Sequence, residues 1–344
     1  TTAPQRPLNH VRCSLEHTEA DLADCLYVPE LFTSADSNLR DFARLSCLPA
    51  SERGASGFLV SRRPRNLAAS APCLIVDDPV AAISRLAAHN RSSSAARFVA
   101  ITGSAGKSTT KEMVTALLSS KGRTARSVFN FNAGRSAVEL TLSNLAPDHE
   151  FCCAEFSGVG DIETQSEIFR PDIAVITNVL WEHVDRFEKA GLRGEEVIDA
   201  IIGRKTSLIR NLNAGGTAIL NRDSDNFDRQ RMAADERGDI HLVTFGEHED
   251  ADVRLLGAEA EDEGPQVRVM VDGVELSYRV GISGPQMVAN SLAALAVARA
   301  LDVDLEPALA TLSTLKPGFR RGEVHTVPWG GGTITAINET VSSS

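Results

Sequence analysis

Apolar runs alternate with helical patterns along the middle of the chain. The runs are short, rich in Val and Ile, and lack a polar face, whereas the stretches between them place apolar residues at helical spacing. Buried strands separated by helices are typical of a parallel sheet covered on both faces. The predicted elements are a strand at 97–102, a helix at 108–122, strands at 151–156 and 172–179, a helix at 195–212, and strands at 217–221 and 241–245.

The N-terminal pattern is that of a smaller unit. Short apolar runs at 26–32, 57–61 and 73–78, with helical patterns between them, predict a small α/β unit. A helix that begins at Asp78 ends in Ser-rich sequence, which indicates a linker to the next part of the chain.

After residue 252 the pattern changes again. The stretch VRVMVDGVELSYRV forms two alternating runs around Asp272-Gly273, which is a strong hairpin signal. Helices at 287–301 and 305–312 follow, then a PGFRRG turn and two short strand patterns around GGG.

These patterns predict an α/β protein in three parts. We expect a small N-terminal α/β domain at 1–95, a central parallel-sheet domain with an antiparallel hairpin region at 96–319, and the start of a further domain at 320–344. The chain stops just after a strand, where an α/β domain would normally continue. The third, Rossmann-like domain is therefore expected to be largely missing.

The stretch FVAITGSAGKSTTKEM, residues 98–113, has the parts of a phosphate site. An apolar strand leads into a glycine-rich turn and then a helix start, so several backbone N–H groups can converge on an anion. Lys107 can reach terminal phosphates, and the hydroxyl of Ser108 or Thr109 can bind Mg²⁺. The candidate nucleotide-binding residues are Gly103, Ser104, Ala105, Gly106, Lys107, Ser108 and Thr109.

The two glycines are only three residues apart, which is shorter than the usual nucleotide loop. This form, T-G-S-x-G-K-[ST]-T-T-K, resembles that of the Mur ligases, the ATP-dependent amide-forming enzymes of peptidoglycan synthesis and their relatives. Further stretches are similar to that family in the same order, over residues 50 to 338. The matching positions are Glu155 after an apolar strand, His183 after an I-T-N strand end, Lys205 on a helix, Asn221 and Asp223 at a strand end, Asn290 on a helix, and Arg321 (or Arg320) in a Gly-Arg turn.

Within the family, the helix start T-x-K-E-M and the hairpin before the Asn290 helix are most similar to the branch containing UDP-N-acetylmuramoyl-tripeptide:D-alanyl-D-alanine ligase. The segment NFNAGRSAVELTLSNL, at 130–145, resembles an Asn-rich segment that helps close the nucleotide site in that branch.

The resemblance implies a ligase that joins a carboxylate acceptor to an amino acid or peptide through an acyl phosphate made with ATP. Such catalysis is mostly positioning and cation stabilisation of the transferred phosphoryl group. Lys107, Lys205 and His183 are the candidate catalytic residues, and Ser108 and Glu155 the candidate ligands of a first Mg²⁺.

His183 follows a strand's carboxyl end, where ligands bind in open α/β sheets, and could serve a second Mg²⁺. The resemblance implies that Asn290 and Arg321 lie on the nucleotide and that Lys205 is carbamylated, which would make it an anionic oxygen ligand. Without the resemblance, Lys205 would be an ordinary solvent-facing helix lysine.

Several positions depart from the family pattern. The helix of Asn290 opens with Gly-Pro-Gln where the family has G-x-H-N, and signatures of uridine-nucleotide recognition are missing from the N-terminal part. In AINETVSSS, Asn338, Val341 and Ser342 replace an Asp, a Tyr and an Asn of the family. ATP use is still expected, while the acceptor and the amine stay open between peptidoglycan synthesis and another pathway.

The composition argues against some classes of binding partner. A net charge of −11 argues against nucleic acid and anionic membranes. No apolar run reaches the length of about 18 residues that spans a bilayer, and the N-terminus lacks a signal-peptide core, so a cytoplasmic protein without membrane insertion is expected. Six cysteines without C-x-x-C spacing are expected to be free thiols: Cys13, Cys25, Cys47, Cys73, Cys152 and Cys153.

Other functions stay open on the sequence. Ligases of the poly-γ-glutamate or folylpolyglutamate type share the chemistry. A P-loop ATPase or kinase without ligation, or an inactive Mur-like regulatory module that binds nucleotide, would keep the loop as well. The RRPR cluster at 62–65 could bind an anionic acceptor or simply solvate a loop.

Overall fold

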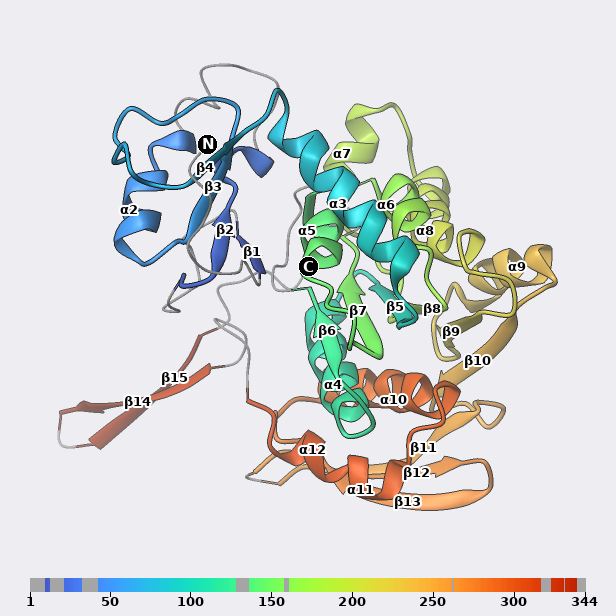
Figure 1. Ribbon diagram of the computed structural model, residues 1–344. Helices are drawn as coiled ribbons and strands as arrows, with labels where there is room; N and C mark the ends of the chain where they lie inside the picture. Colours follow the sequence, from blue (N-terminus) through green and yellow to red (C-terminus); the bar gives the residue numbers. More distant parts are fainter. Residues whose placement is uncertain are drawn as a thin grey trace. The chain divides into compact units, whose positions relative to one another are not determined.

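The computed structural model describes residues 10–12, 22–32, 43–127, 136–157, 161–261, 263–316, 323–330 and 332–338. The chain forms two compact units: the first contains residues 1–95 and 127–147, and the second residues 96–126 and 148–344 (Figure 1). The first unit is thus built from two separate stretches of sequence.

The first unit contains a four-stranded parallel sheet with the order β1-β2-β3-β4. Alternate residues of its strands pack on opposite faces: Leu59 lies in one apolar cluster with Ile83, and the adjacent Phe58 in another with Tyr27. Its elements are β1 (His10–Arg12), β2 (Cys25–Tyr27), the 3-10 helix η1 (Pro29–Phe32), α2 (Cys47–Glu52), β3 (Gly57–Val60), β4 (Cys73–Ile75), α3 (Pro79–Ser93) and α5 (Ser136–Ser143).

Helix α5 packs in this first unit, although the sequence placed it inside a continuous domain at 96–319. Leu140 belongs to the cluster with Leu59 and Ile83. The Asn144 side chain accepts a hydrogen bond from the N–H of Val11 at 2.7 Å and donates to the Val11 carbonyl at 3.2 Å. The Asn-rich part of the predicted nucleotide-closing segment, residues 130–135, lies outside the described residues.

The second unit contains a nine-stranded sheet with the order β13-β12-β11-β10-β9-β8-β5-β7-β6. Pairing is parallel from β6 to β11 and antiparallel among β11, β12 and β13, so the predicted parallel α/β sheet is confirmed. Its strands are β5 (Arg97–Thr102), β6 (Thr124–Arg126), β7 (Phe151–Glu155), β8 (Ile173–Ile176), β9 (Thr217–Asn221), β10 (His241–Gly246), β11 (Val253–Glu259), β12 (Gln266–Val271) and β13 (Val274–Arg279).

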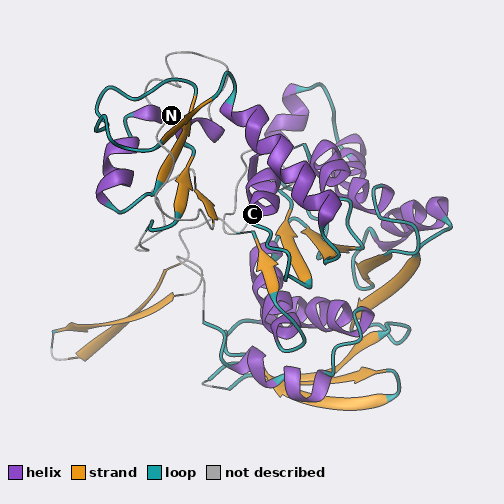
Figure 2. Ribbon diagram, in the orientation of Figure 1, coloured by secondary structure: helices purple, strands orange, loops and turns teal. Residues whose placement is uncertain are grey.

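Helices cover both faces of the parallel part of this sheet (Figure 2). Val99 and Ile101 of β5 pack in one apolar cluster with α4 and α10, whereas the ring of Phe98, the residue before Val99, contacts Phe169 of α6 at a centroid distance of 5.2 Å. The helices are α4 (Lys107–Ser119), α6 (Ile162–Phe169), α7 (Val184–Lys189), α8 (Glu195–Arg210), α9 (Phe227–Arg237), α10 (Pro285–Ala300), α11 (Leu305–Ala308) and α12 (Ala310–Ser313).

The predicted hairpin turn is present between β12 and β13. Asp272 and Gly273 have φ angles of 50° and 79°, the positive values that a tight two-residue hairpin turn needs. A second hairpin pairs β14 (Glu323–Trp329) with β15 (Gly332–Asn338) around the GGG sequence. Among the helices that the structure describes, none has both the length and the apolar character needed to cross a lipid bilayer.

Candidate functional site

The phosphate loop joins β5 to α4 and has the backbone that its glycines allow. Gly103 has a φ of 152° and Gly106 a φ of 80°, both unfavourable for residues with a side chain. The N–H of Thr110 makes the first intrahelical bond, to the Gly106 carbonyl at 2.8 Å. The first N–H groups of α4 have no acceptor within the helix itself, so the start of the helix favours an anion.

The residues that follow β8 hold this loop in place by hydrogen bonds, which are called the clamp below. The Thr177 hydroxyl donates to the Ala105 carbonyl at 2.6 Å, and Asn178 accepts from the Ala105 N–H at 2.8 Å. The Ser104 hydroxyl accepts from the Leu180 N–H at 2.9 Å and donates to the Leu180 carbonyl at 3.2 Å. A Cβ on Gly103 would overlap the Thr177 side chain, so glycine is also needed here for space. These hydrogen bonds could not be predicted from the sequence, because their donors and acceptors are distant along the chain.

Lys107 lies over the loop. Its ammonium donates to the carbonyls of Gly103 at 2.9 Å and Ser104 at 3.1 Å. The cation is therefore held beside the backbone that would cradle a phosphate, where it can neutralise an anion without a large movement.

Ser108 and Glu155 are brought together as the metal prediction requires. The Ser108 hydroxyl, in the first turn of α4, donates to Glu155 Oε2 at 2.6 Å. Glu155 ends β7, which pairs with β5, so both oxygens lie at the same edge of the sheet. In the part of the chain that the structure describes, no group of three or more His, Cys, Asp or Glu side chains is arranged to hold a metal ion.

Lys205 is buried, and this rules out the solvent-facing alternative. Its side chain is 1% exposed and forms an ion pair with Glu182, which is 4% exposed. Burial lowers the pKa of Lys205 to about 8, Glu182 opposes that shift, and the positive charges of Lys107 and Arg204 add to it. The charge of Lys107 is one of the smaller contributions to the lowered pKa of Lys205.

Glu182 was not predicted from the sequence. It immediately precedes His183, and the only available signal was an acidic residue after a strand's carboxyl end. His183 itself is exposed, precedes α7 and has a φ of 50°. With Glu182 and Lys205 it lines a small cavity, so the structure places His183 beside Lys205.

Asn290 lies on α10 against the phosphate loop. A Cβ on Gly106 would overlap its side chain. Asn290 is 5% exposed, and its Nδ2 is buried without a hydrogen-bond partner among the described residues. A buried amide donor of this kind is costly unless a ligand satisfies it.

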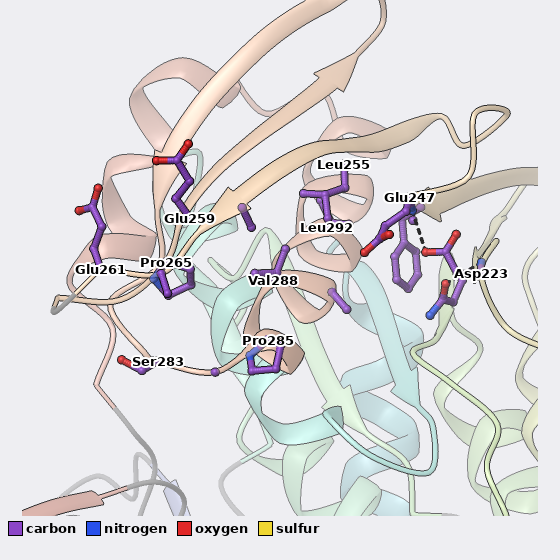
Figure 3. A pocket seen from close by; sticks show the side chains of 17 residues that line it. Asp223, Glu247, Leu255, Glu259, Glu261, Pro265, Ser283, Pro285, Val288 and Leu292 are labelled. Carbon is purple, nitrogen blue, oxygen red and sulfur yellow. Dashed lines mark hydrogen bonds between the residues drawn. The ribbon is translucent and has the colours of Figure 1, made fainter.

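Asn221 and Asp223, at the end of β9, form hydrogen bonds with residues that follow β8 and β10. Asn221 donates to the Thr177 carbonyl at 3.3 Å and accepts from the Asp223 N–H at 2.9 Å. The Asp223 carboxylate accepts from the N–H groups of Glu247 at 2.7 Å and His248 at 2.9 Å. A pocket borders these residues and the start of α10 (Figure 3).

The remaining predicted residues are two arginines near the C-terminus, the cysteines and the RRPR cluster. Arg320, Arg321 and Cys13 lie outside the described residues. The cysteines that are described, Cys25, Cys47, Cys73, Cys152 and Cys153, are free and buried, as expected. In the RRPR cluster, Arg63 donates to the carbonyls of Ala68 at 3.2 Å and Ala71 at 3.1 Å, so this guanidinium holds its own loop.

Comparison with known proteins gives a consistent result. The chain matches the Mur ligase middle domain over residues 101–298. It is 30% identical over 279 residues to the UDP-N-acetylmuramoyl-tripeptide–D-alanyl-D-alanine ligase of Synechocystis sp., covering 80% of this chain and 56% of that enzyme. The Escherichia coli enzyme of the same name is 27% identical over 266 residues, covering 76% of this chain and 56% of the enzyme.

Solved structures share the fold. MurF from Acinetobacter baumannii has a TM-score of 0.72 at 23% identity, covering 98% of this chain and 68% of that one. MurF from Thermotoga maritima in complex with ADP has a TM-score of 0.65 at 21% identity, covering 92% and 68%. The chain spans 56% of the Synechocystis and Escherichia coli enzymes. Because the middle-domain match extends over more than half of its residues, the chain belongs to the Mur ligase family.

Proposed function

We propose that this protein is an ATP-dependent ligase that joins a carboxylate acceptor to the amine of an amino acid or peptide. The observation that carries the proposal is the phosphate loop with Lys107 above it and the Ser108–Glu155 oxygen pair at its edge. The similar enzymes are named for joining D-alanyl-D-alanine to UDP-N-acetylmuramoyl-tripeptide, and one solved relative carries ADP.

The reaction has two steps. A carboxylate oxygen of the acceptor attacks the γ-phosphorus of ATP, the bond to the β-phosphate oxygen breaks, and an acyl phosphate and ADP form. The amine then attacks the acyl carbon, phosphate leaves with the carbon–oxygen electron pair, and the amine loses a proton. Charge accumulates on the transferred phosphoryl group, so the Lys107 ammonium and the amides of the α4 start stabilise it where they already lie.

The oxygen pair of Ser108 and Glu155 fits a Mg²⁺ ion. A hydroxyl and a carboxylate oxygen 2.6 Å apart are ligands that a hard cation prefers, and Mg²⁺ usually takes its remaining ligands from water and substrate phosphates. The ion would supply charge neutralisation between the phosphates. The protein's part is to fix the two oxygens on α4 and β7 at one edge of the sheet.

The surroundings of Lys205 support the proposed carbamylation. With a pKa of about 8, a substantial fraction of this amine is neutral near physiological pH, and only the neutral amine can attack CO₂. A carbon–nitrogen bond forms, the amine releases a proton, and the side chain becomes an anion. The ion pair with Glu182 then has to open, leaving oxygen ligands beside His183, where the second Mg²⁺ is proposed.

The direct test is a ligation assay on the full chain. ATP, Mg²⁺, UDP-N-acetylmuramoyl-tripeptide and D-alanyl-D-alanine are supplied first, then pools of other carboxylates and amino acids, with phosphate release and new amide masses followed together. The ligase is supported if phosphate release requires both substrates, is lost in Lys107→Ala, and persists in the matched surface variant Lys189→Ala.

Two results would contradict the proposal. Phosphate release that needs no amine would indicate an ATPase, and ATP binding without any turnover would indicate an inactive nucleotide-binding module.

A further inference from the structure

Leu180 and Trp181 form a small exposed apolar surface in the segment that follows β8 and precedes Glu182 and His183. Leu180 is 49% exposed and Trp181 is 55% exposed. Within the part of the chain that the structure describes, the indole ring of Trp181 has no aromatic or cation–π partner. Single exposed apolar residues are common, but two adjacent ones beside a candidate site indicate a surface that a ligand covers.

The chain is held in place on both sides of Trp181. On one side, the Leu180 N–H donates to the Ser104 hydroxyl at 2.9 Å, and this hydroxyl donates to the Leu180 carbonyl at 3.2 Å. On the other side, the carboxylate of Glu182 forms its buried ion pair with Lys205. An indole has only two side-chain torsions, so Trp181 presents a large apolar surface at a small cost in conformational entropy.

This surface connects the phosphate loop to the buried lysine. Ser104 belongs to the loop, where Lys107 can reach the terminal phosphates of a nucleotide. Glu182 is the partner of Lys205. In the first step of the proposed reaction, the acceptor carboxylate attacks the γ-phosphorus while ATP occupies the loop, and the amine enters only afterwards. The carbon atoms next to the acceptor carboxylate are therefore the part of the substrates that this step brings toward Trp181.

We propose that Leu180 and Trp181 bind the hydrocarbon side chain next to the reacting carboxylate, so that the protein selects acceptors whose last residue has a long aliphatic side chain. This assignment deepens the proposed function and rests on it. Neither side chain is charged, and a hydrocarbon chain packed on the indole face leaves water, which stabilises the complex in proportion to the apolar area buried. An acceptor that ends in glycine has the same carboxylate but lacks this contribution.

The test compares two UDP-N-acetylmuramoyl-tripeptides that differ only in their last residue, norleucine or glycine. Each is supplied to the full chain with ATP, Mg²⁺ and D-alanyl-D-alanine. We expect the norleucine tripeptide to have a KM about tenfold lower, because several methylene groups move from water onto the indole face. Trp181→Ala should remove this difference, and Trp181→Phe should restore most of it. Neither variant should change the KM of ATP.

Trp329→Ala is the matched control. Trp329 is the second of the two tryptophans of the chain and is 72% exposed, but it lies on the hairpin of β14 and β15. We expect its replacement to leave the ratio of the two KM values unchanged. In Trp329→Phe, Trp181 is the only source of tryptophan fluorescence. The norleucine tripeptide should change this emission in the presence of ADP and Mg²⁺, whereas D-alanyl-D-alanine alone should not.

The outcomes separate this assignment from the proposed function. An acceptor that the natural protein and Trp181→Ala ligate with the same KM, whether one of these tripeptides or another carboxylate, would overturn the assignment alone. A KM that rises in Trp181→Ala only for D-alanyl-D-alanine would overturn it as well, because the surface would then bind the amine. If no carboxylate is ligated, the proposed function fails and this assignment fails with it.

Discussion

The hydroxyl of Thr177 is one of the contacts that fix the phosphate loop. It is buried and donates to the Ala105 carbonyl at 2.6 Å. Thr177→Val keeps the shape of the side chain but removes this donor. The Ala105 carbonyl then retains only the weaker hydrogen bond from the Asn178 amide, at 3.3 Å. Losing one hydrogen bond of this kind costs about 1 kcal/mol. We therefore expect ADP to bind several-fold more weakly, as measured by calorimetry.

Thr177→Ser retains the hydroxyl and is the control, with affinity near that of the natural protein. Equal ADP affinity in the Val and Ser variants would show that the clamp does not set the geometry of the loop.

Lys205 makes folding stability depend on pH in a definite direction. Its pKa is about 8 in the folded protein and 10.5 ordinarily, so between these values the unfolded chain binds more protons than the folded one. The free energy of unfolding therefore rises with pH across this window, by up to about 1.4 kcal/mol per pH unit from this group. Below pH 8 the lysine is charged in both states and contributes no slope.

This slope is measured by urea unfolding at pH 7.5, 8.5 and 9.5. The reference is Lys205→Met combined with Glu182→Gln, which replaces the buried ion pair without leaving one charge alone. The natural protein should gain stability relative to this variant as pH rises. Parallel curves would mean that Lys205 is not buried as an amine of lowered pKa.

At the scale of elements, periodicity predicted strands well. The predicted strand at 97–102 corresponds to β5, and the runs at 151–156, 217–221 and 241–245 match β7, β9 and β10 within a residue. These strands are buried, so local apolar sequence reflects their environment directly. The helix predicted at 108–122 ends at Ser119, because helix ends depend on capping contacts rather than on periodicity.

The candidate site was predicted in part. Lys107, Ser108 and Glu155 could be found because a short motif and a strand end carry them. The Glu182 pairing of Lys205 and the Thr177 clamp could not be found, since both join residues more than 20 positions apart through the folding of β8 against its neighbours. Helix α5 was placed in the wrong unit for the same reason: its apolar face shows that it is buried, but not against which partner.

Substitution by Ala should have different effects at two glycines, Gly106 at the start of α4 and Gly203 inside α8. Gly106 has a φ of 80° and no room for a Cβ beside Asn290, whereas Gly203, inside α8, has helical surroundings and open space. Gly106→Ala should abolish measurable ADP binding, because both the strain and the overlap distort the loop. Gly203→Ala should leave binding intact and raise the melting temperature, since Ala favours a helix by about 1 kcal/mol over Gly.

ADP binding by the two variants is measured by calorimetry, and their melting temperatures by thermal unfolding. Normal ADP binding by Gly106→Ala would mean that the loop does not need the backbone conformation that the structure shows.

At the scale of the whole molecule, the chain leaves its first unit at residue 95 and returns to it at 127–147. Between these stretches it builds β5, the phosphate loop and α4 of the second unit. The segment that contains the phosphate loop is therefore an insertion between two parts of the first unit. Each unit has its own apolar clusters, so a change in the core of one should be detected first within that unit.

Leu140 of α5 tests this organisation. It is 3% exposed and packs with Leu59 and Ile83, so Leu140→Ala should cost about 2–5 kcal/mol in the unit to which α5 belongs. Hydrogen exchange followed by mass spectrometry should show faster exchange in β3 and α3, with α4 and α10 protected as before and ADP affinity unchanged. Leu292→Ala, in the core of the second unit, should give the opposite pattern and weaken ADP binding. Faster exchange in α4 caused by Leu140→Ala would instead place α5 with the nucleotide-binding unit, and the first unit would then be continuous in sequence.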